Sequence, residues 1–133
     1  MDWTQLELFK GIDLNDSFIL NWALEGDQLT FELEASIWPE SSYYSHPKSR
    51  EHTCYRKAVL SFLDIKNING LKPIEAVSST VDPDGSKDYG NIDTLSQTEN
   101  GYNISGNFGA VKIMGGVLRF EVHKSGSLSL IHI

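Results

Sequence analysis

Residues 17–37 read SFILNWALEGDQLTFELEASI, and this stretch decides the fold. Apolar side chains occupy every second position from 29 to 37, with polar side chains between most of them. The first half has the same spacing, at Phe18, Leu20, Trp22 and Leu24. Glu25-Gly26-Asp27 separates the halves and has the composition of a tight turn. The sequence therefore predicts a β-hairpin with one buried face and one solvated face.

Further strand patterns follow the hairpin along the chain. Residues 54–64 carry apolar side chains on both faces, which is typical of a central strand. The remaining strands are expected over residues 92–98, 102–114, 117–123 and 127–133. The turns between them are predicted at Asn100-Gly101, Gly115-Gly116 and Ser125-Gly126, since glycine provides the positive φ that hairpin turns need. Asn67-Ile68-Asn69-Gly70 is also expected to turn, and residues 71–77 to form a short strand or a bend at Pro73.

The first ten residues have a different spacing. Trp3, Leu6 and Phe9 recur every three residues, which favours a short helical turn that ends at Gly11. Together these patterns predict one domain over residues 1–133 in the all-β class, with minor α content. The expected architecture is an antiparallel β-sandwich or a partly open barrel that carries a short N-terminal helical turn.

Composition limits the possible functions. The 133 residues carry a formal net charge of −7, and this charge disfavours binding to nucleic acid and favours a basic protein as partner. Cys54 is the only cysteine, so no intramolecular disulfide can form and a reducing, cytoplasmic location is expected. No apolar run is long enough to cross a membrane, and no secretory leader is recognisable.

The first long loop, residues 38–53, is rich in aromatic and basic side chains. Its candidate binding residues are Trp38, Tyr43, Tyr44, His46, Arg50 and His52. Aromatic rings beside cations suit protein interfaces and stacking on a sugar, whereas a loop that covers the core would bury the same rings. A metal site at His46, His52 and Cys54 is not predicted, because zinc sites use closer, paired spacing.

The second long loop, residues 81–93, is acidic. Its candidate binding residues are Asp82, Asp84, Asp88 and Tyr89. The aspartates suggest a calcium loop, but the sixth position of that motif requires glycine and is Lys87 here. A local turn stabilised by aspartate side chains explains the composition better, so no cofactor is predicted. The loop could still present an acidic surface to a basic protein.

No known catalytic motif is present, since Gly-x-Ser-x-Gly and phosphate-binding glycine loops are missing. Residues 16–19, 31–39 and 82–93 resemble segments of small uncharacterised bacterial β-rich proteins. Some acidic bacterial β-proteins of this size are immunity proteins that block basic toxins, and the resemblance implies at most such an immunity-like role. It implies no enzymatic activity.

Two functions are expected from these observations. The first is a non-enzymatic binding module that holds another protein through loops 38–53 and 81–93. The alternative is a small-molecule or carbohydrate-binding protein, or a hydrolase, that uses the aromatic and histidine side chains of loop 38–53. The last predicted strand, residues 127–133, would form either an exposed edge that pairs in a homodimer or an edge covered by the N-terminal turn.

Overall fold

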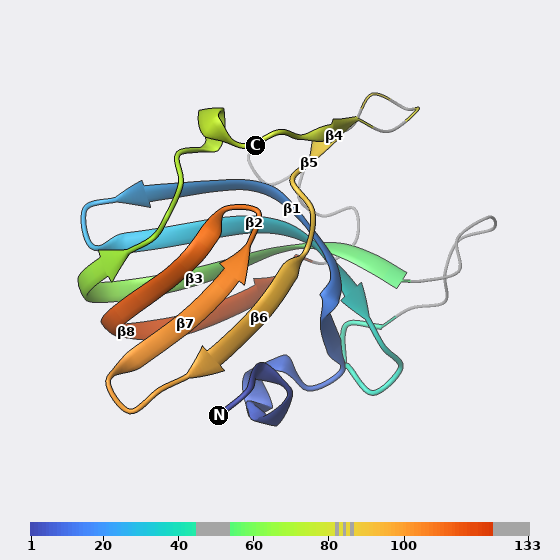
Figure 1. Ribbon diagram of the computed structural model, residues 1–133. Helices are drawn as coiled ribbons and strands as arrows, with labels where there is room; N and C mark the ends of the chain where they lie inside the picture. The colour runs from blue at the N-terminus through green and yellow to red at the C-terminus, as the bar shows by residue number, and fades with distance from the viewer. Residues whose placement is uncertain (45–53, 82, 84, 86, 124–133) are drawn as a thin grey trace, which may run out of the picture.

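The computed structural model describes residues 1–44, 54–81, 83, 85 and 87–123, and over these residues the protein is all-β with short 3-10 turns (Figure 1). The N-terminal 3-10 turns are η1 (Trp3–Gln5) and η2 (Glu7–Phe9), and η3 covers Ile74–Ala76. The strands are β1 (Ile12–Glu25), β2 (Gln28–Ile37), β3 (Cys54–Asn69), β4 (Thr80–Val81), β5 (Lys87–Asp88), β6 (Ile92–Gln97), β7 (Gly101–Gly106) and β8 (Gly109–Val122). Within these ranges no helix is long and apolar enough to cross a membrane.

Six strands form one antiparallel sheet in the order β1-β2-β3-β8-β7-β6, which curls into a half-barrel. The two edge strands approach each other where β6 begins. The amide of Ile19 donates to the carbonyl of Gly90 at 2.8 Å, and the amide of Tyr89 donates to the carbonyl of Ile19 at 2.8 Å. The side-chain amide of Asn15 also donates to the carbonyl of Ile92 at 2.9 Å. Of the two predicted architectures, the structure is the partly open barrel.

The predicted first hairpin is confirmed in β2 and corrected in β1. All five alternating apolar residues of β2 are buried, and the turn lies at Gly26-Asp27. In β1, however, Phe18 and Leu20 are only half-buried and Leu24 is 41% exposed, whereas Ile19 is buried. Register shifts interrupt the β1–β2 pairing between Asp13 and Phe18 and between Ile19 and Asn21. An extra residue at a bulge moves the following side chains to the other face, so the simple alternation fails there.

The predicted turn at Gly115-Gly116 is wrong. Both glycines lie inside β8 and have positive φ, and Gly115 pairs with Ile65 of β3 beside the register shift between Ile65 and Asn67. The pair therefore bends a long strand instead of ending it. The turn between β7 and β8 lies at Asn107-Phe108, inside the single strand predicted over residues 102–114.

Residues 67–77 bring one correction and one confirmation, since the bend after Pro73 was one of the two alternatives predicted for residues 71–77. The predicted turn at residues 67–70 is also wrong, since β3 stays paired with β8 through Asn69. The following segment bends at η3, which begins directly after Pro73.

The predicted turn near Asn100-Gly101 is confirmed, because Thr98 donates its amide to the carbonyl of Gly101 at 2.8 Å. The strand predicted over residues 127–133, with the proposed dimer edge, lies outside the described residues.

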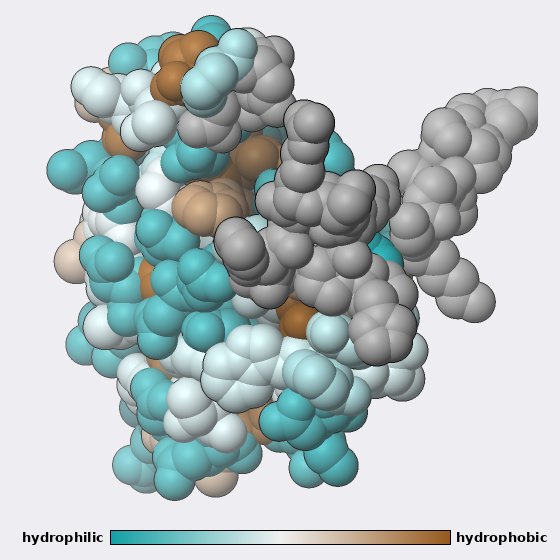
Figure 2. Space-filling view, turned by 90° about the vertical axis from the view of Figure 1, so that its right-hand side faces the viewer, coloured by the Kyte–Doolittle hydropathy of each residue, from teal (hydrophilic) through white to brown (hydrophobic). Residues whose placement is uncertain are grey.

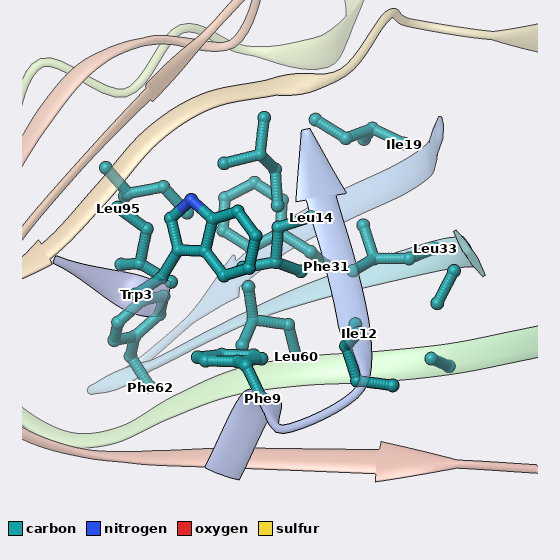
Figure 3. Close-up of a cluster of buried hydrophobic side chains, with 14 of the residues drawn as sticks. Trp3, Phe9, Ile12, Leu14, Ile19, Phe31, Leu33, Leu60, Phe62 and Leu95 are labelled. Atoms are coloured by element: carbon teal, nitrogen blue, oxygen red, sulfur yellow. The ribbon is translucent and has the colours of Figure 1, made fainter. Parts of the chain in front are cut away.

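The interior of the curled sheet is filled by side chains. The N-terminal helical turn is confirmed in the 3-10 form, and it places Trp3 and Phe9 over one end of the core with ring centroids 6.4 Å apart. Figure 3 shows these two rings converging with side chains from the sheet, among them Leu60 and Phe62. At the other end, the indole nitrogen of Trp22 donates to the carbonyl of Lys72 at 3.0 Å, which fastens the segment before η3.

Candidate functional site

The first predicted loop begins with a compact turn that is fastened to the N-terminal segment. The amide of Trp38 donates to the carbonyl of Gly11 at 2.8 Å. The amide of Ser41 then donates to the carbonyl of Trp38 at 2.9 Å, and the Ser41 hydroxyl accepts from the amide of Tyr43 at 3.1 Å. These bonds hold residues 38–44 beside Gly11 and η2, so the segment has a defined position on the barrel.

The aromatic residues of this segment divide into two groups. Trp38 and Tyr43 are exposed to 45% and 44%, whereas Tyr44 is partly buried and packs against the core. Of these three residues, Tyr44 therefore covers the core, which was one of the two roles predicted for the aromatic rings of this loop. Trp38 and Tyr43 remain available for contact with another molecule. The other candidates of this loop, His46, Arg50 and His52, lie outside the described residues.

Tyr43 lines a pocket of about 380 Å³, which we call the Tyr43 pocket. Three chain segments form it: the N-terminal region around η2, residues 40–43, and the end of β8. Its lining residues are Glu7, Leu8, Lys10, Ile12, Glu40, Ser41, Ser42, Tyr43 and Phe120. Only Tyr43 among these was predicted as a site residue. Glu40, Ser41 and Ser42 belong to the same predicted loop but were not singled out, and the other lining residues come from segments that are distant in the sequence.

The lining of the Tyr43 pocket combines apolar and charged groups. Ile12 is buried and Phe120 is half-buried. The ring centroids of Phe120 and the buried Phe9 lie 5.1 Å apart, so this side of the pocket packs against the core. Glu7, Lys10 and Glu40 are exposed. An apolar wall with a few charged groups is the composition of binding pockets in general.

The second predicted loop contains the small β4–β5 hairpin, in which Val81 pairs with Lys87 and Thr80 with Asp88. The Asp88 carboxylate accepts from the amide of Gly90 at 2.9 Å, as expected for a local turn stabilised by an aspartate. The Tyr89 ring packs edge-on against Trp22 at 5.2 Å and so contributes to the core. Asp82 and Asp84 lie outside the described residues.

Both candidate loops are attached to β1. Residues 38–44 are attached by the hydrogen bond from the Trp38 amide to Gly11, directly before β1. Tyr89 and Gly90 are attached by their backbone hydrogen bonds with Ile19. Gly11 and Ile19 are eight residues apart, so at about 3.3 Å per residue the two attachment points lie at most about 26 Å apart. Figure 1 shows the N-terminal turns at one end of the curled sheet and the β4–β5 hairpin at the other. The structure thus attaches residues 38–44 beside the N-terminal turns and Tyr89-Gly90 beside the β4–β5 hairpin, at two points along the same part of the chain.

The described residues that are visible on this side of the molecule are mainly hydrophilic. Figure 2 shows this side of the molecule with its hydrophobic residues in small separate patches. Among the described residues, no group of three or more His, Cys, Asp or Glu side chains is arranged to hold a metal ion. Cys54, the third member of the metal alternative, is buried at the start of β3.

Comparison of the chain with protein-family models, with curated proteins and with solved structures found no match. The resemblance to small bacterial β-rich proteins, and the immunity-like role that it implies, therefore stay predictions.

Proposed function

We propose that this protein is a non-enzymatic binding module that holds another protein through residues 38–44, with the β4–β5 hairpin as a second contact. The observation that carries the proposal is the exposure of Trp38 and Tyr43 on a segment that the backbone holds in place. Tryptophan and tyrosine dominate the energetically important positions of protein interfaces. A segment that is already fixed loses little conformational freedom when it binds.

The spacing of the loops fits one protein partner. A typical stable interface covers about 800 Å² on each partner, which is a patch about 30 Å across. The attachment points of the two loops lie within that span, and Val81 of the β4–β5 hairpin is exposed as well. The net charge of −7 favours a basic partner, whose approach it would accelerate at low ionic strength. An immunity-like role against a basic toxin would be one instance of such binding.

The proposal is tested by affinity capture from cognate cell extract, followed by binding measurements with the purified partner. The bait variants are Trp38→Ala with Tyr43→Ala, and the matched control is Val117→Ala, which truncates an exposed side chain of β8 that does not line the Tyr43 pocket. We expect the control to bind like the wild type and the double variant to bind at least about tenfold more weakly. Equal affinity of the double variant and the wild type for the purified partner would reject the proposal.

The Tyr43 pocket favours a second candidate, a small-molecule or carbohydrate-binding protein. Its volume of about 380 Å³ falls within the range of known ligand pockets, and Tyr43 could stack on a sugar ring. A neutral glycoside should then raise the melting temperature of the wild type but not of Tyr43→Ala. The hydrolase version of this candidate needs His46 or His52 as proton carrier, and it is tested by hydrolysis of chromogenic glycosides and esters with His46→Ala and His52→Ala.

A further inference from the structure

We propose that the Tyr43 pocket receives an arginine side chain of a basic partner protein. This inference rests on the proposed function and makes it more specific. It brings three further residues into the binding site, which the sequence analysis did not associate with the first loop. They are Glu7 and Leu8 of η2 and Phe120 of β8. The apolar part of the pocket would hold the arginine stem, and the carboxylates with the Tyr43 ring would hold the guanidinium.

The apolar part of the pocket suits a long, flexible stem. Leu8 is 42% exposed although it is apolar, and it lines the same pocket as the half-buried Phe120. Arginine buries its methylene groups along such surfaces while its charged end stays near water. The exposed Tyr43 ring adds a face on which a guanidinium can stack through a cation–π contact.

The charge of the pocket selects a cation. Glu7 and Glu40 line it with Lys10 as the one base, which leaves one excess negative charge. All lining residues except Phe120 come from the first 43 residues, and Lys10 is the only Lys or Arg before position 48. Residues 1–47 contain nine Asp and Glu in all, of which Glu7 and Glu40 line the pocket. Arginine fits better than lysine because its planar guanidinium pairs with carboxylates and stacks on rings.

The test uses the full chain and a small probe, N-acetyl-L-arginine amide, with amide NMR shifts as readout. The neutral isostere N-acetyl-L-citrulline amide has nearly the same shape and no charge. We expect saturable shifts around Lys10 and Ser41–Tyr43 with the arginine probe and none with citrulline. Increasing the salt concentration from about 0.05 to about 0.5 M should weaken binding, because salt screens exposed charges.

Charge variants give a sharper test, because removing the acids and removing the base should change the affinity for the arginine probe in opposite directions. Glu7→Gln with Glu40→Gln should weaken binding of the arginine probe about threefold or more, and Lys10→Gln should strengthen it. The matched control is Glu25→Gln with Glu99→Gln, which changes the net charge equally at two exposed residues outside the pocket. Equal binding of the citrulline probe, no saturable shifts with arginine, or equal weakening by the control would overturn the inference.

Failure of this inference can be separated from failure of the proposed function. If a purified partner loses affinity with Trp38→Ala and Tyr43→Ala but not with Glu7→Gln and Glu40→Gln, the protein is a binding module whose pocket holds no arginine. If neither pair changes the affinity, both proposals fail. Spectra of all variants should overlay with that of the wild type away from the pocket, which shows that the fold is intact.

Discussion

The Ser17 hydroxyl accepts a hydrogen bond from the backbone amide of Ser36 at 2.9 Å, and both residues are fully buried. The same hydroxyl donates to the carbonyl of Asp13 at 2.6 Å. These bonds lie where β1 bulges between Asp13 and Phe18 and its ladder with β2 is interrupted. A serine side chain thus satisfies two backbone groups at a point where the sheet leaves them without strand partners.

Replacing Ser17 by alanine should therefore lower the stability of the protein. The change removes both hydrogen bonds, which involve the buried Ser36 amide and the partly buried Asp13 carbonyl, and should lower the free energy of unfolding by about 1–3 kcal/mol. Urea unfolding measures the loss. A free energy of unfolding within about 0.5 kcal/mol of the wild type would show that other groups satisfy these backbone atoms.

Ser36→Ala provides a contrast within the same pair of strands. The Ser36 hydroxyl is buried and has no hydrogen-bond partner within the described part of the chain. A buried hydroxyl without a partner is destabilising, so its removal should leave the free energy of unfolding unchanged or slightly increased. A loss of more than about 1 kcal/mol in urea unfolding would indicate a partner for this hydroxyl.

Phe108 should be among the most sensitive positions of the fold although it lies in a turn. Its side chain is fully buried, with the ring centroids of Phe31 and Trp22 at 4.8 and 6.0 Å. Phe108→Ala would leave a cavity in the barrel and should lower the free energy of unfolding by about 3–5 kcal/mol, as measured by denaturant unfolding. Val117→Ala, at an exposed position, should change stability by about 0.5 kcal/mol or less. Similar losses in both variants would contradict this packing.

The pKa of the Asp2 carboxyl should lie below its ordinary value of 3.8. The Thr4 hydroxyl donates to this carboxylate at 2.6 Å and the Thr4 amide at 3.1 Å, and these bonds lower the pKa of Asp2 from 3.8. Asp2 is the N-cap of η1. Its lowered pKa in the folded state means that this capping interaction contributes fully to stability above pH 3.8 and is lost as the pH falls through the folded pKa.

An NMR titration of the Asp2 carboxyl carbon measures this pKa directly. Thr4→Val removes the hydroxyl but keeps the backbone bond, so the midpoint should rise towards 3.8. Thr80→Val changes an exposed threonine of β4 and should leave the midpoint unchanged. A wild-type midpoint at or above 3.8 would contradict the cap at η1.

The sequence by itself determined the all-β class, the β2 strand with its turn at Gly26, and the N-terminal turn that buries Trp3 and Phe9. These features follow from side-chain periodicity over a few residues, which decides the face on which each side chain lies. It also located Trp38 and Tyr43 in a loop, though it left their exposure open.

Only the tertiary structure decided the rest. The bulges of β1, the passage of β8 through Gly115-Gly116 and the burial of Phe108 depend on register between strands that are distant in the chain. Register is set by backbone hydrogen bonds and by the curl that closes β1 onto β6, and a local pattern encodes neither. The Tyr43 pocket arose in the same way, because η2 and Phe120 meet residues 40–43 only after the sheet has curled.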